Sequence, residues 1–113
     1  MICEFGDVVV VPFPFVERPI SKRRPALVFS TRAFNTENDH SALAMITTAA
    51  GSIWPSDIEI ADGASAGIAH RSYIRWKLFT LPNRLILRRL GHLGERDRKK
   101  VTEFAAQAFA AID

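Results

Sequence analysis

Basic side chains occur in two groups that could bind an anion. The first group is the run Lys22, Arg23 and Arg24, which comes just before an apolar segment. The guanidinium group of arginine is planar and permanently charged, and it donates two parallel hydrogen bonds to a phosphate. Arginines at the point where a loop enters a strand are firmly anchored, so this run is a candidate phosphate-binding site.

The second basic group consists of Arg71, Arg75 and Lys77. In a strand this spacing puts the side chains on one face. Aromatic residues beside such a face would form a stacking surface for single-stranded nucleic acid. The candidates are Trp54, Trp76, Phe13 and Phe15. A structural explanation competes, because strand arginines often line the solvent side of a sheet and aromatic residues mostly belong to the core.

Two hydroxyl groups, Thr47 and Thr48, follow the apolar pair Met45-Ile46. At a strand end they can donate to a phosphate oxygen, although threonine is also a common strand residue. Other chemistry has no signature in the chain. It has no Gly-x-Ser-x-Gly motif and no glycine-rich phosphate loop, and its histidines lack the spacing of metal ligands. We expect no metal and no cofactor, and we expect surface or loop positions for His40, His70 and His92.

Short strands separated by loops are predicted up to about residue 94. The run from Val8 to Val11 is typical of a strand buried on both faces, and Pro12 and Pro14 should end its pairing because proline lacks a backbone donor. Residues 16–24 predict an exposed loop. Further strands are expected at 25–29, 43–47, 58–60, 72–81 and 85–90, with loops at 32–41, where one helical turn would fit, and at 63–67.

A C-terminal helix is predicted after Gly94, which is a tolerable N-cap, with Asp97 in its first turn. Its apolar stripe has helical spacing and consists of Val101, Phe104, Ala105, Ala108 and Ile112. Its basic side chains form either a solvated face or a face for an acidic partner, and they are Arg96, Arg98, Lys99 and Lys100. Strands followed by one helix predict a small β-barrel or strongly curved sheet with a helical cap.

Composition limits the class of protein. The chain has 113 residues, of which 48% are hydrophobic and 24% charged, so one globular domain is expected and disorder is excluded. A single cysteine, Cys3, is typical of a reducing cytosol, and neither a signal peptide nor a membrane helix is predicted. We therefore expect a cytoplasmic protein. A net charge of +3 favours an anionic partner only weakly.

Several short motifs follow one another along nearly the whole chain. They are Gly6-Asp7-Val8-Val9, Pro12-Phe13-Pro14-Phe15, Lys22-Arg23-Arg24-Pro25-Ala26-Leu27-Val28, Ile46-Thr47-Thr48, Trp54-Pro55-Ser56-Asp57-Ile58, Ser72-Tyr73-Ile74-Arg75, Lys77-Leu78-Phe79-Thr80-Leu81 and Leu90-Gly91-His92-Leu93. With these motifs in this order, the chain resembles the MazF/PemK (Kid-like) toxins of bacterial type II toxin–antitoxin systems.

The resemblance implies one domain over residues 1–113, with an SH3-like antiparallel barrel and a C-terminal helix, acting as a homodimer. It implies metal-independent cleavage of single-stranded mRNA, which inhibits translation and growth. In this reaction the ribose 2′-oxygen attacks the adjacent phosphate and the 5′-oxygen leaves. The expected partner is an antitoxin whose disordered, acidic C-terminal segment folds into the RNA groove.

The resemblance also implies roles for individual residues. Arg24 matches the catalytic arginine before Pro-Ala-Leu-Val and would stabilise the phosphate, and Thr47 would hydrogen-bond the scissile phosphate. The expected RNA-binding residues are Ser21, Lys22, Arg23, Thr48, Arg71, Arg75 and Lys77. One position departs from the family, because Trp76 stands where many members have an acidic residue before the threonine that Thr80 matches. His70 or Glu17 could replace that acid.

Two other functions remain open from the sequence. A non-catalytic gyrase poison resembling CcdB would share the fold, but such chains end in an apolar tail that contains tryptophan. This chain ends in Ala110-Ala111-Ile112-Asp113. An RNA-binding module without activity is the second alternative.

Overall fold

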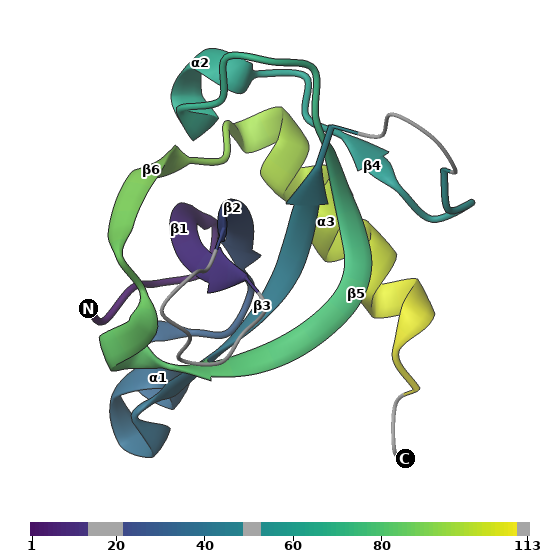
Figure 1. Cartoon of the computed structure of the whole chain (residues 1–113). Helices are drawn as coiled ribbons and strands as arrows, with labels where there is room; N and C mark the ends of the chain where they lie inside the picture. Colours follow the sequence, from purple (N-terminus) through teal and green to yellow (C-terminus); the bar gives the residue numbers. More distant parts are fainter. Residues whose placement is uncertain (14–21, 49–52, 111–113) are drawn as a thin grey trace.

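The computed structural model describes residues 1–13, 22–48 and 53–110. They form one antiparallel sheet of six strands, curled into a half-barrel, with the C-terminal helix packed against it (Figure 1). The strand order is β4-β5-β3-β2-β1-β6. The strands are β1 Asp7–Phe13, β2 Lys22–Val28, β3 His40–Thr47, β4 Ile58–Glu59, β5 Tyr73–Pro82 and β6 Arg88–His92. The helices are α1 Arg32–Asn38, α2 Gly63–Ala66 and α3 Glu95–Ala108, with a 3-10 turn at Asn83–Leu85. The predicted fold class is confirmed.

The sheet has a buried core on each of its two faces. One core, which we call the helix-side core, includes Val101 of α3 and contains Val8, Leu27, Ala44, Ile46, Ile60, Ala66, Ile74 and Leu93. The other core, on the opposite face, contains Cys3, Val9, Val11, Ala26, Val28, Leu43, Leu81 and Ile86. Alternate residues of one strand enter different cores because strand side chains alternate between faces. The continuous valine run in β1 is explained by this double burial.

The proline at the end of β1 does not end its pairing, contrary to prediction. Pro12 lies opposite Arg23 and Phe13 opposite Lys22, so β2 begins at Lys22 and the predicted loop over 16–24 is too long. The carbonyl of Val10 accepts from Leu87 on the β6 side, and the β6 pairing stops at Val10. The nitrogen of Pro12, two residues further, points to this same edge of β1. Because β6 no longer pairs with β1 there, the missing backbone donor of proline breaks no hydrogen bond. Pro14 lies outside the described residues.

Three other predicted segments differ in the structure. Residues 63–66 form α2 rather than a loop, because the carboxylate of Asp62 caps the turn by accepting from the backbone and hydroxyl groups of Ser65. The last strand is shifted to Arg88–His92 and contains Gly91. A Cβ atom at Gly91 would overlap the carbonyl of Ser65, so glycine lets α2 lie against β6. The segment at 32–38 forms two turns of helix instead of one.

The helix α3 begins at Glu95 after Gly94, as predicted. Within its predicted stripe, Val101 is buried and Ala108 is exposed, while Ile112 lies outside the described residues. Asp97 is completely buried, and its carboxylate accepts from the backbone N–H groups of Ala61 and Asp62 at 3.0 and 2.9 Å. It therefore fixes the segment after β4 to the helix. The basic side chains predicted for this helix are exposed, and they are Arg96, Arg98, Lys99 and Lys100.

Candidate functional site

The predicted catalytic pair lies on two neighbouring strands. In the β2–β3 ladder, Ala26 lies opposite Met45 and Leu27 opposite Ala44. The observed pairing ends at Ala26 and Met45, and the same register extended by two residues would put Arg24 opposite Thr47. Directly opposite residues share a face and lie about 5 Å apart. Arg24 and Thr47, which are 23 positions apart in the sequence, thus lie on neighbouring strands, and the extended register places them side by side.

Arg24 is half-buried beside an aromatic ring. It lies opposite Val11, and the carbon of its guanidinium group is 5.0 Å from the centroid of the Phe13 ring. Its Nε atom is buried and, within the described residues, has no hydrogen-bond partner. A buried donor without a partner costs about 1–3 kcal/mol. The positive charge of the half-buried guanidinium group suits an anionic ligand such as a phosphate.

Arg75 is held by a buried carboxylate. Two hydrogen bonds join it to Asp57, from Nε to Oδ1 at 3.2 Å and from Nη2 to Oδ2 at 2.9 Å, and the Asp57 side chain is only 1% exposed. The hydrogen bond from Arg75 holds the pKa of Asp57 below its usual value. Asp57 also accepts from the backbone of Trp54, whose ring lies 5.5 Å from the Arg75 guanidinium carbon. Arg75 lies opposite Met45, and Tyr73, two residues earlier in β5, lies opposite Thr47.

The predicted cationic row along β5 is interrupted. Arg71 precedes the strand and forms an exposed ion pair with Glu59 at 2.9 Å, and this hydrogen bond raises the pKa of Arg71. Lys77 is exposed in a bulge, because the β3–β5 register moves from Arg75 opposite Met45 to Leu78 opposite Ala44. Carboxylates therefore neutralise two of the three predicted cations.

The remaining predicted RNA-binding residues occupy different positions. Lys22 and Arg23 are exposed at the start of β2, where alternation puts Lys22 on the face of Arg24 and Arg23 on the other. Thr48 is exposed directly after β3. Ser21, like Phe15 and Glu17, lies outside the described residues. His70 is exposed in the segment before β5.

Trp76 belongs to the core, so it is not part of a stacking surface. Its ring stacks on Phe104 of α3 at 4.7 Å and meets the edge of Phe29 at 5.7 Å. Trp54 differs from it, because its side chain is 40% exposed. Of the two tryptophans, only Trp54 offers a ring to a ligand.

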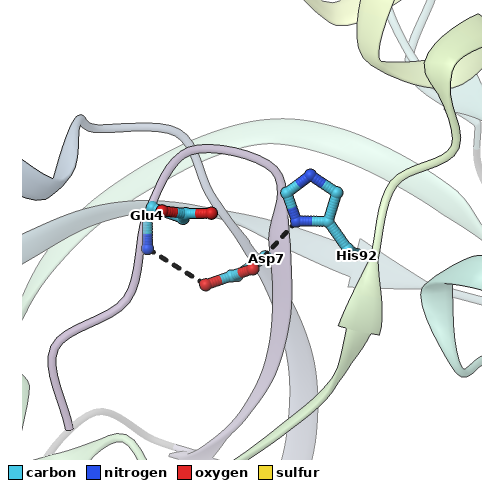
Figure 2. Close-up of side chains that lie close together, drawn as sticks. All are labelled: Glu4, Asp7 and His92. Atoms are coloured by element: carbon cyan, nitrogen blue, oxygen red, sulfur yellow. Dashed lines mark hydrogen bonds and ion pairs between the residues drawn. The ribbon is translucent and has the colours of Figure 1, made fainter.

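A second polar cluster joins residues that the sequence keeps far apart (Figure 2). The His92 Nδ1 atom lies 2.9 Å from a carboxylate oxygen of the buried Asp7, and the other oxygen accepts from the Glu4 backbone at 3.0 Å. His92 is half-buried in β6, whereas the sequence predicted a surface or loop position. No local motif could reveal this pair, because its members are 85 residues apart.

The ligand atoms of Glu4, Asp7 and His92 all lie within 4.8 Å of one another, a spacing that could suit a metal ion. Two guanidinium groups oppose this use. Arg89 lies 3.7 Å from Asp7, and an Arg98 nitrogen lies 3.3 Å from the His92 Nε2 atom. Positive charge at both ends repels a cation. The cluster instead links β1, β6 and α3 through charge-assisted hydrogen bonds.

Comparison with known families identifies the family of the chain. A family model described as "PemK-like, MazF-like toxin of type II toxin-antitoxin system" matches residues 4–109. The chain belongs to this family. It is accordingly a MazF-like toxin of a type II toxin–antitoxin system, as the sequence motifs predicted.

Solved structures of MazF-like proteins have the same fold. A MazE–MazF crystal structure from Deinococcus radiodurans matches with a TM-score of 0.74 and 18% identity, over 97% of this chain and 100% of that one. The Mycobacterium tuberculosis toxin MazF-mt6 matches with a TM-score of 0.71 and 18% identity, over 91% and 95%. An endoribonuclease in complex with its cognate antitoxin from a Mycobacterial species matches with a TM-score of 0.64 and 18% identity, over 95% of this chain and 92% of that one. No curated protein matches this MazF-like chain significantly. Among the described residues, no helix is long and apolar enough to cross a membrane.

Proposed function

We propose that this MazF-like toxin is an endoribonuclease that cleaves single-stranded mRNA in the cytoplasm and so inhibits translation and growth. The observation that supports the proposal is that Arg24 and Thr47 lie on the neighbouring strands β2 and β3, in a register that, extended from Ala26 and Met45, puts them opposite each other. The endoribonuclease named among the similar structures supports the same activity. At 18% identity that likeness concerns the fold, so the activity rests on these residues and on family membership.

The geometry suits attack by an oxygen of the substrate itself. As the ribose 2′-oxygen bonds to the adjacent phosphorus, negative charge increases on the phosphate oxygens. Arg24 stabilises this charge, and the Thr47 hydroxyl donates a hydrogen bond to one of the same oxygens. The 5′-oxygen leaves, and the products are a 2′,3′-cyclic phosphate and a 5′-hydroxyl. The protein supplies no nucleophile and, in this proposal, no metal ion.

Binding of the RNA strand uses exposed groups around the pair. Lys22 and Arg23 contribute charge at the start of β2, Thr48 contributes a hydroxyl, and Trp54 offers a ring to a base. We also propose that the toxin is a homodimer and that an antitoxin with an acidic, disordered C-terminal segment inhibits it. The MazE–MazF complexes among the similar structures support an antitoxin as partner.

The test is incubation of the purified protein with a long single-stranded RNA in the presence of EDTA, followed by mapping of the ends. We expect discrete cuts that leave 2′,3′-cyclic phosphate or 3′-phosphate and 5′-hydroxyl ends. RNA that stays intact under conditions in which the protein inhibits DNA gyrase would overturn the proposal in favour of a CcdB-like poison. RNA that is bound but never cut would leave only a binding function.

A further inference from the structure

A single row of residues crosses four strands of the sheet. Tyr73 of β5 lies directly opposite Thr47 of β3 and also opposite Glu59 of β4. The β2–β3 register, extended by two residues beyond Ala26 and Met45, adds Arg24 beside Thr47, so the row consists of Arg24, Thr47, Tyr73 and Glu59. Neighbouring members are about 5 Å apart. Figure 1 shows the same neighbourhood, with β5 running along β3 and β4 on its outer side.

All members of this row are on the face opposite α3. The residues next to them in their strands belong to the helix-side core, with Ile46 and Ile74 buried in it and Ile58 packed against it. Since strand side chains alternate, the row residues point to the other side of the sheet. On that other face, Val11, opposite Arg24, belongs to the second core. Tyr73 therefore shares both the face and the level of the proposed catalytic pair.

An arginine lies beside the ring of Tyr73. Its side chain is half-buried, and the guanidinium carbon of Arg71 lies 5.9 Å from the centre of its ring. Arg71 is held in turn by Glu59 at 2.9 Å. A phenol is protonated at neutral pH and donates a hydrogen bond.

The chain also needs a proton carrier at a new position. Cleavage requires proton transfer at both the attacking and the leaving oxygen. The family's frequent acidic position holds Trp76, which is packed against Phe104. Tyr73 carries a phenol and lies directly opposite Thr47 on this face.

We propose that Tyr73 is the general acid of the RNA cleavage, an inference that rests on the proposed function. As the bond between phosphorus and the 5′-oxygen breaks, the phenol of Tyr73 gives its proton to that oxygen. The 2′-hydroxyl loses its proton to water while its oxygen bonds to phosphorus. The tyrosinate then regains a proton from water. Thus one proton is released and one is taken up in each turnover.

The experiment compares Tyr73→Phe with the wild type on two substrates that share one sequence, cut by the wild type. One is ordinary RNA, and the other has sulfur in place of the 5′-oxygen at the cut site. A thiolate leaves without protonation, so the sulfur substrate does not need a general acid. We expect Tyr73→Phe to lose about 10²–10⁴-fold in kcat on ordinary RNA and to match the wild type on the sulfur substrate. Thermal melting checks that the variant is folded.

The control is Arg24→Ala, which should be slow on both substrates because its role is to stabilise charge on the phosphate. Full activity of Tyr73→Phe on ordinary RNA, or an equal loss on both substrates, would overturn the assignment of Tyr73 while the nuclease function stands. If the wild type cuts neither substrate nor any long RNA, the proposed function fails and takes this inference with it.

Discussion

Asp57 and Arg75 form a two-point ion pair, with hydrogen bonds of 2.9 and 3.2 Å and a carboxylate that solvent does not reach. The same carboxylate accepts from the Trp54 backbone at 3.1 Å. One acidic side chain therefore fixes both the strand arginine and the turn that carries the exposed tryptophan. This connection fixes the segment before β4 to β5.

The pair predicts a specific acid dependence of stability. Because the hydrogen bond from Arg75 lowers the pKa of Asp57 in the folded protein, the unfolded chain binds more protons at acidic pH. The stabilisation is fully present above the unfolded pKa of about 4 and is lost as the pH falls through the lower folded pKa. Asp57→Asn should unfold in less urea than the wild type at pH 7, and the difference should shrink below pH 4. A constant difference from pH 7 to pH 3 would contradict this explanation.

Trp54 should contribute to RNA binding through its exposed ring. Stacking of a base on an aromatic ring contributes about 1–3 kcal/mol, so Trp54→Ala should bind single-stranded RNA about 5- to 150-fold more weakly. The measurement uses RNA with 2′-O-methyl groups, which cannot be cut. Phe34→Ala is the matched control, because Phe34 is a similarly exposed aromatic residue on α1. Equal affinities for the two variants would exclude Trp54 as a base-stacking residue.

Asp97 should be important for stability, although it lies in a helical turn where a carboxylate usually has a small effect. Asp97→Ala removes charged acceptors from two backbone N–H groups, and we expect the free energy of unfolding to fall by about 2–4 kcal/mol. Glu95→Ala, which removes an exposed carboxylate from the same turn, should cost well under 1 kcal/mol. Urea unfolding distinguishes the two. Similar losses for both variants would mean that Asp97 acts only through the helix dipole.

Cys3 should react slowly with thiol reagents. Its side chain is 2% exposed, and burial raises the pKa of its thiol. Both effects reduce the amount of accessible thiolate. Labelling with a colorimetric disulfide reagent at pH 8 should be slow in the native protein and rapid in 6 M guanidinium. Rapid stoichiometric labelling of the native protein would show that the N-terminal segment is detached from the second core.

Residues adjacent in the sequence, or repeated with a regular period, were predicted well. The valine run in β1 and the apolar stripe around Val101 each follow from local spacing, and the motifs around Arg24 and Thr47 identified the two strand ends that meet. The register between β2 and β3 was needed to show that these ends are opposite each other. The sequence alone carries no signal for such a pairing.

The residues that sequence reasoning missed acquire their roles from tertiary contacts. In the sequence Tyr73 is an ordinary strand residue. The pairing of β5 with β3 and β4 shows that it lies between Thr47 and Glu59. Arg75 reads as a free cation, yet Asp57, 18 positions earlier, neutralises it. The prediction that alternate β5 side chains share one face failed beyond Arg75, because a bulge inserts residues before Leu78. No sequence pattern predicts this bulge. Long-range pairing decides each of these cases.

The central claim is that Arg24 acts on the phosphate that is cut. The most direct measurement is the cleavage rate of a single-site RNA by Arg24→Ala in EDTA, beside Arg32→Ala, which removes an exposed arginine of α1. Loss of a group that stabilises transition-state charge costs about 10²–10³-fold in rate. We predict a loss of that size for Arg24→Ala, an unchanged rate for Arg32→Ala, and similar melting temperatures for both. Equal rates for the two variants would contradict the claim.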